Sequence, residues 1–150
     1  MIELVIDETQ WNEALTDASA VAEQALAAAT ALEPAVQGEI AILLASDTKM
    51  RHLNAEFRGK HAPTNVLAFP GDENGFLGDI ALGFETCRRE ADAAGRSLRD
   101  HATWLIVHGI LHLIGYDHQT DEQAVVMEAR ESEILRSMGI ADPYAELETT

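Results

Sequence analysis

Three histidines in the second half of the chain have a spacing that suits a metal ion. They are His108, His112 and His118, in the segment HGILHLIGYDH. On a helix, His108 and His112 lie about 40° apart around the axis and about 6 Å apart along it, so both imidazoles point the same way. Gly115 lets the chain turn and bring His118 round as a third ligand. Three neutral imidazoles with one open position are typical of a catalytic zinc site, whose bound water has a pKa near ~7.

Three other interpretations fit this segment. The histidines are core or capping residues, or they hold a metal that is purely structural. Structural zinc usually has four protein ligands, often cysteines, and Cys87 is the only cysteine in the chain. The spacing also matches the zinc protease pattern HExxHxxGxxH, but Gly109 stands where the protease carries its general-base glutamate. Without that carboxylate peptide hydrolysis lacks its proton acceptor, so we expect another reaction.

A second cluster surrounds Arg58, which is followed by Lys60 and His61 between a predicted helix and a predicted strand. Arginine holds a phosphate through two parallel N–H bonds and stays charged at any working pH. Arg58 therefore suits phosphate anchoring and the stabilisation of charge in a phosphoryl-transfer transition state. Most basic loops are only solvated, so this interpretation requires Arg58 to lie near the histidines.

Two residues are candidates for supporting the histidines, because ligating imidazoles usually donate their second N–H to a carboxylate or carbonyl. They are Asp117 and His101. A simple role in the turn is the stronger alternative for Asp117. His101 lies seven residues before His108, which puts it on the same helix face but about 10 Å away. We therefore expect His101 to be a packed or surface histidine.

The elements that must position these residues follow from hydrophobic periodicity and turn residues. The predicted strands are 2–6, 39–45, 64–69 and 76–83, and the predicted helices are 11–32, 47–57, 85–94, 98–114 and 121–138. Turn residues at 70–75 indicate a hairpin, and Asp47 and Ser97 are the expected N-caps of two helices. We expect a single α/β domain of α+β type over residues 1–150, with a small mixed sheet of about four strands packed against about five helices.

Composition limits the class of protein. The chain has 150 residues, of which 47% are hydrophobic and 24% charged, values of an ordinary globular protein. The net charge is −16, but residues 1–48 carry nine acidic residues and no Lys or Arg, whereas residues 49–120 hold eight basic against nine acidic residues. A neutral or positive cleft inside an acidic envelope fits this distribution, so nucleic acid is not excluded. The N-terminus is unlike a secretory signal and the apolar runs are short, so we expect a cytoplasmic protein without membrane contact.

These segments together carry a family resemblance. The stretch from His108 to His118 matches the signature HGxLHLxGYDH of the YbeY family of bacterial rRNA-maturation endoribonucleases. Three further segments agree at corresponding positions: Asn54 with Arg58 to Lys60, Thr64 with Val66-Leu67 and Phe69-Pro70, and Leu77 to Ile80. The chain therefore resembles this family over most of its length.

The resemblance implies a metalloprotein with one zinc ion per chain on His108, His112 and His118. It also implies that Arg58 is catalytically important, and we expect Arg58 and His108 to be the catalytic residues. RNA is the implied substrate, in maturation of the 3′ end of small-subunit rRNA and in ribosome quality control. The implied partners are the small ribosomal subunit, one of its proteins and the GTPase Era.

The chain departs from the family at two positions. The family commonly shows TDVLSF where this chain has Asn65 and Ala68 in TNVLAF. If the family's aspartate handles charge or protons, Asn65 cannot replace it, and Asp79 or Asp117 are the remaining carboxylate candidates. If the aspartate only forms hydrogen bonds within the loop, Asn65 can take its place.

The resulting hypothesis is metal-assisted cleavage of single-stranded RNA, with Arg58 countering negative charge in the transition state. Activated water, polarisation of a phosphoryl oxygen and attack by the substrate's 2′-OH all stay open. Aromatic residues make up only 5% of the chain, so recognition by backbone, shape or a partner is expected rather than extensive base stacking. The alternatives are a metal-dependent hydrolase of another substrate and a ribosome assembly factor with a structural zinc.

Overall fold

A four-stranded sheet lies between two layers of helices in this computed structural model, which describes residues 2–72 and 75–144. The strands, in their order across the sheet, are β1 (Ile2–Ile6), β2 (Glu39–Ala45), β4 (Phe76–Gly83) and β3 (Val66–Pro70). β1, β2 and β4 are parallel, and β3 runs antiparallel to β4. The mixed sheet, its four strands and the antiparallel pairing after the turn at 70–75 confirm the predictions, although residues 73–74 of that turn lie outside the described part.

The sheet divides its side chains between two faces because strand residues alternate. On β2, Ile40, Ile42 and Leu44 are buried, and Ile42 lies beside Ile80 of β4. These residues belong to the main core between the sheet and the larger helical layer. A smaller core, which includes Met50, lies on the other face.

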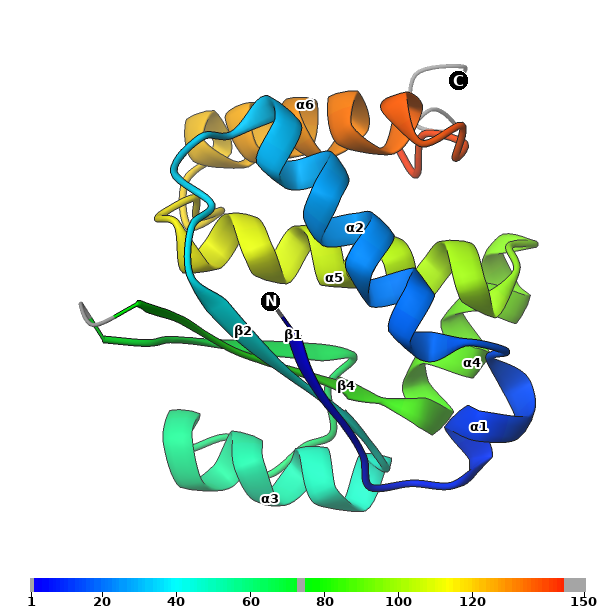
Figure 1. Cartoon of the computed structure of the whole chain (residues 1–150). Coiled ribbons are helices and arrows are strands. Elements are labelled where there is room, and N and C mark those ends of the chain that lie inside the picture. The colour runs from blue at the N-terminus through cyan, green and yellow to red at the C-terminus, as the bar shows by residue number, and fades with distance from the viewer. Residues whose placement is uncertain (1, 73–74, 145–150) are drawn as a thin grey trace.

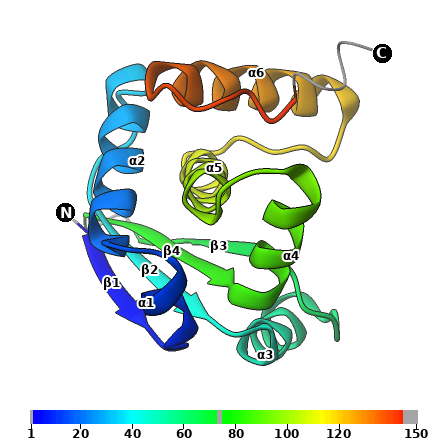
Figure 2. The same cartoon turned by 90° about the vertical axis from the view of Figure 1, so that its right-hand side faces the viewer.

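Helices lie on both faces of the sheet (Figures 1 and 2). The larger layer holds α2 (Ala18–Leu32), α4 (Phe84–Ala94), α5 (Leu98–Leu113) and α6 (Asp121–Ser137), and α3 (Asp47–Arg58) lies on the opposite face. On the larger side α6 packs over α5 rather than on the strands. Figure 2 shows α5 end-on, enclosed by α2, α4, α6 and the sheet. Most side chains of α5 are therefore buried.

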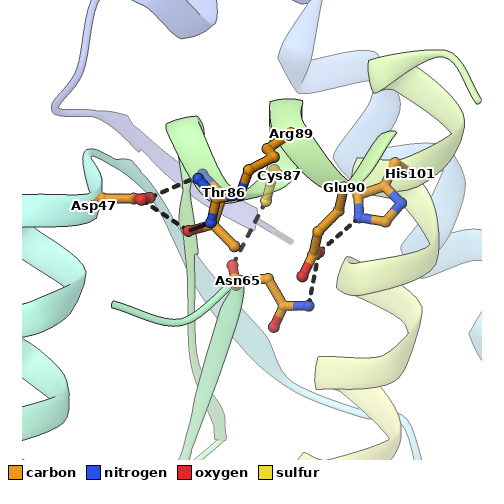
Figure 3. Close-up of polar contacts among 7 residues, drawn as sticks. All are labelled: Asp47, Asn65, Thr86, Cys87, Arg89, Glu90 and His101. Atoms are coloured by element: carbon orange, nitrogen blue, oxygen red, sulfur yellow. Dashed lines mark hydrogen bonds and ion pairs between the residues drawn. The ribbon is translucent and has the colours of Figure 1, made fainter. Parts of the chain in front are cut away.

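Two local predictions are wrong. The helix expected over 11–32 is divided into α1 (Gln10–Ala14) and α2, because Asp17 takes a left-handed conformation with φ of 56° and its carboxylate accepts the N–H of Ala20 as a new N-cap. The N-cap of α3 is Ser46, not Asp47. Asp47 instead accepts hydrogen bonds from the backbone N–H and the hydroxyl of Thr86 (Figure 3).

The remaining helices begin and end within one or two residues of their predicted bounds. Ser97 caps α5 as expected, accepting the N–H of Asp100. Six helices are therefore present in the described residues, where about five were predicted. Within residues 2–72 and 75–144, no helix is long and apolar enough to cross a lipid bilayer.

Candidate metal centre

The structure brings the three histidines of the motif together. His108 and His112 lie one turn apart on α5, and their ring centroids are 4.8 Å apart. The ring of His118 lies 5.5 Å from that of His108 and 5.1 Å from that of His112. One nitrogen of each ring lies within 4.8 Å of the others. These three side chains can therefore hold one metal ion.

The turn after α5 brings His118 to this point. α5 ends at Leu113, and Gly115 adopts a φ of +109°, which only glycine takes without strain. The N–H of Tyr116 then bonds back to the carbonyl of Leu111. Asp117 accepts the backbone N–H of His118, so its contact lies within the turn and not at a histidine ring. This contact supports the turn role predicted for Asp117.

The environment of His112 favours the neutral imidazole that metal binding requires. Burial lowers the pKa of His112 below its ordinary value, and neighbouring His108 and His118 lower it further. A neutral imidazole keeps a lone pair for a metal. Three nitrogen donors of this kind fit a divalent transition metal such as zinc, and do not fit Mg²⁺ or Ca²⁺, which prefer oxygen.

Arg58 lines the same cavity of about 200 Å³ as the three histidines. It is the last residue of α3, where Gly59 ends the helix in a left-handed conformation. The loop that follows is held by Asn54, whose side-chain amide donates to the carbonyl of Ala62. The condition set by the sequence, that Arg58 lie near the histidines, is therefore met. Lys60 and His61 are exposed and do not line this cavity.

The packing of α5 on β4 explains why glycine follows His108. A Cβ atom at Gly109 would lie 3.0–3.1 Å from three side-chain atoms of Ile80, closer than ordinary van der Waals contact. A side chain at this position would therefore push α5 and β4 apart, which disfavours the glutamate of the protease pattern.

One polar neighbour of the histidines was missed by sequence reasoning. Nδ1 of His108 lies 3.1 Å from Oε2 of Glu131, a fully buried residue of α6. Oε1 of Glu131 accepts hydrogen bonds from Nε1 of Trp104 at 2.5 Å and from the hydroxyl of Tyr144 at 2.9 Å. The available signal was a charged residue within the buried face of α6, which includes Met127, Ile134 and Leu135.

Asn65 also lines the histidine cavity, and a chain of hydrogen bonds holds it in place (Figure 3). Its side-chain amide donates to Oε1 of Glu90 at 3.0 Å, and Nε2 of His101 lies 3.0 Å from the same oxygen. An aspartate has no proton to donate to Glu90 at neutral pH. Asn65 therefore bonds to α4 rather than within its own loop, through a donor that an aspartate would lack, and buried His101 is packed, as predicted.

The structure does not bring Asp79 to the histidines. Asp79 and Ile80 are neighbours on β4, so their side chains point to opposite faces of the sheet. Ile80 faces α5, whereas Asp79 lines a cavity with Glu3 on the side of α3. Burial raises the pKa of Asp79 above its ordinary value, and the nearby charge of Glu3 raises it further. Asp79 is therefore ruled out as a carboxylate beside the histidines.

Comparison with known proteins identifies the family. The family model described as endoribonuclease YbeY matches residues 5–139. The chain belongs to the YbeY family. Proteins named endoribonuclease YbeY from Sphingopyxis alaskensis and Ruegeria pomeroyi are 47% and 43% identical to it. These similarities span 91% and 95% of this chain and 92% and 97% of the two relatives.

A solved structure supports the assignment of the fold. The solution structure of a Thermotoga maritima protein is similar to this YbeY-family chain with a TM-score of 0.57 and 25% sequence identity. The similarity covers 95% of this chain and 98% of the other. The predicted family and α+β fold class are thus both confirmed.

Proposed function

We propose that this chain is a zinc-dependent endoribonuclease that cleaves single-stranded RNA in the maturation of the 3′ end of small-subunit rRNA. The observation that carries the proposal is one cavity lined by His108, His112, His118 and Arg58. Membership of the YbeY family supports RNA as the substrate. The nitrogen-only donor set supports zinc as the metal.

The residues of the chain divide the work between metal binding and phosphate binding. A bound zinc ion supplies Lewis-acid polarisation and lowers the pKa of water. Arg58 donates paired N–H bonds to the scissile phosphate and counters the charge that grows on its oxygens in the transition state. Because Arg58 ends a helix packed on the sheet, its backbone is already in place before substrate binds.

The open cavity favours catalysis over a structural metal. A structural zinc site normally has four protein ligands and no free position. In the described residues, the group at this centre consists of three histidines, and the cavity beside them also reaches Arg58. The packing of Gly109 likewise disfavours hydrolysis of peptides by a protease-like glutamate.

The wider setting of the proposal rests on family membership. The chain acts as one domain over residues 1–150, in the cytoplasm, on rRNA precursors in the small ribosomal subunit. A protein of that subunit and the GTPase Era are its proposed partners, and ribosome quality control is a further proposed role. The chain has a net charge of −16, so its acidic surface outside the cavity would repel RNA. RNA contact would then be restricted to the cavity.

The test compares RNA cleavage by zinc-loaded wild type, His112→Ala and Arg58→Glu, with circular dichroism to check that each folds. We expect His112→Ala to lose at least ~10³-fold in rate through loss of the metal, and Arg58→Glu to lose ~10²-fold or more. His61→Ala, in the loop that follows Arg58 but outside the cavity, is the matched control and should keep its activity. Folded His112→Ala that cleaves at the wild-type rate would overturn the proposal.

The products identify the attacking group. A 2′,3′-cyclic phosphate at the new end indicates attack by the substrate's own 2′-OH, whereas a linear phosphate and a free hydroxyl indicate attack by water. Replacing the 2′-OH with hydrogen at the scissile nucleotide stops only the first of these reactions.

A further inference from the structure

Glu131 is a charged side chain in a place that otherwise holds apolar residues. Its side chain is 1% exposed, and its neighbours on the inner face of α6 are Met127, Ile134 and Leu135. Burial of a carboxylate costs about 3 kcal/mol or more unless hydrogen-bond donors surround it. Fold stability alone would be served as well by a leucine here.

Three hydrogen-bond donors converge on this carboxylate from different parts of the chain. Trp104 and His108 reach it from successive turns of α5, and Tyr144 reaches it from the segment after α6. The Trp104 and Tyr144 rings also pack edge to face, with centroids 5.8 Å apart. Glu131 is thus held in one orientation, with Oε2 left for His108.

The contact with His108 determines which ring nitrogen is available. Because Oε1 of Glu131 already accepts from Trp104 and Tyr144, the 3.1 Å contact at Oε2 favours the His108 tautomer that carries its proton on Nδ1 and donates it to this oxygen. Nε2 is then unprotonated and free to bind a metal. Among the described residues, the rings of His112 and His118 have no hydrogen bond of this kind, so His108 is the ligand whose tautomer and rotation the protein fixes.

We propose that Glu131 is a positioning residue of the metal centre, which holds His108 in its metal-binding tautomer and is itself held by Trp104 and Tyr144. The inference rests on the proposed function in one respect, that the three histidines bind a metal. It makes the segment after α6 part of the support of that metal. It also accounts for a buried charge that the packing of α6 does not require.

The test measures metal binding rather than RNA cleavage, on the full-length protein. Zinc affinity is obtained by competition with a chromophoric chelator, and the visible spectrum of the cobalt-loaded protein reports the geometry around the metal. We expect Glu131→Gln to bind zinc about 10–100-fold more weakly and to change the cobalt spectrum. Tyr144→Phe removes one hydrogen bond to Glu131 without touching a histidine, and should weaken zinc binding by about 3–10-fold.

Ile134→Val is the matched control. Ile134 is fully buried on α6 in the main core, and its apolar side chain forms no hydrogen bond to Glu131 or to the segment after α6. We expect its zinc affinity and cobalt spectrum to equal those of the wild type. Equal weakening in Ile134→Val and Glu131→Gln would overturn the proposal, because it would show a general effect of loosening α6.

The remaining outcomes are also decisive. Wild-type affinity and spectrum in Glu131→Gln would overturn the proposal directly. If metal-free Glu131→Gln does not fold, Tyr144→Phe takes its place, and wild-type affinity and spectrum in that variant would overturn it instead. A wild-type protein that binds neither zinc nor cobalt would overturn the proposed function, whereas one that binds both but cleaves no RNA would leave the role of Glu131 intact.

Discussion

Two histidines of helix α5 each contact a glutamate of a neighbouring helix, and the two pairs are buried in opposite ways. Nε2 of His101 lies 3.0 Å from Glu90, and Nδ1 of His108 lies 3.1 Å from Glu131. In the first pair the histidine side chain is 3% exposed and the glutamate 39%. In the second pair the values are 19% and 1%. The buried partner is therefore the histidine in one pair and the glutamate in the other.

This difference determines what the second nitrogen of each ring can do. Nδ1 of His101 is buried and has no hydrogen-bond partner in the described part of the chain. The second nitrogen of His108 belongs to a partly exposed ring that lines a cavity with His112 and His118. A buried glutamate thus leaves its histidine free for a ligand, whereas a buried histidine is limited to packing and to fixing its glutamate.

The largest expected effect comes from His108→Ala. Loss of one of three imidazoles should abolish tight zinc binding, and RNA cleavage should fall by at least ~10³-fold. Zinc at ~100 times its Kd stabilises the wild type by about 2.7 kcal/mol through mass action, and this increment should disappear in the variant. Thermal unfolding with zinc and with a chelator measures it. If zinc stabilises His108→Ala as much as the wild type, then His108 is no more a metal ligand than His101, and the difference between the two pairs does not hold.

His101→Ala should have the opposite profile. Removing this buried ring leaves a cavity against Trp104 and frees Glu90, so the free energy of unfolding should fall by about 2–3 kcal/mol. Zinc affinity should stay within about threefold of wild type, because Trp104 keeps its hydrogen bond to Glu131 and the histidines of the cavity are unchanged. Urea unfolding and chelator competition measure the two quantities separately. A loss of zinc affinity as large as that in His108→Ala would contradict the comparison.

A smaller effect is expected from Asn65→Asp. This variant tests the contact between residue 65 and Glu90, the more exposed partner of His101. The new carboxylate would face Glu90 where an amide now donates at 3.0 Å, so a hydrogen bond to a charged group is replaced by repulsion. Partial exposure screens this repulsion, and we expect a loss of about 1–2 kcal/mol in the free energy of unfolding. Asn65→Ala removes the donor without adding charge. If the two variants are equally stable, repulsion by Glu90 contributes nothing.

The two pairs also show what the sequence can predict. The spacing of His108 and His112 with Gly115 specifies a shared helix face and a turn, both of which are local properties of the backbone. The proximity of Arg58 is different, because it depends on α3 and α5 packing on opposite faces of one sheet. Hydrophobic periodicity located both helices, but only the assembled fold gives the distance between their ends.

Glu131 and Asp17 show two further limits. Glu131 is one of several acidic residues on α6, and burial alone distinguishes it from the others. Its place among apolar residues at helical spacing was a usable signal. Asp17 interrupts an alanine-rich stretch whose high helix propensity concealed the break, although aspartate is a favoured N-cap. In both cases a polar side chain takes a position or a conformation that the surrounding apolar pattern does not predict.

The smallest expected effect concerns Cys87, which packs beside Asn65 and Glu90. Burial raises the pKa of this thiol well above its ordinary value of 9.0, and the charges of Glu90 and Asp47 raise it further. Above pH 9.0 the unfolded chain loses the thiol proton while the folded chain keeps it, so unfolding releases a proton and stability falls as pH rises. The slope is at most about 1.4 kcal/mol per pH unit.

Cys87→Ala isolates this slope, because other groups that titrate at alkaline pH remain in both proteins. Urea unfolding from about pH 8 to about pH 10 should show the stability difference between wild type and variant shrinking as pH rises, by less than ~1 kcal/mol half a unit above the ordinary pKa. A constant difference would mean that the thiol ionises equally in both states. In that event the surroundings of the Glu90 pair would be as open to water as the histidine cavity, and the contrast between the two pairs would no longer hold.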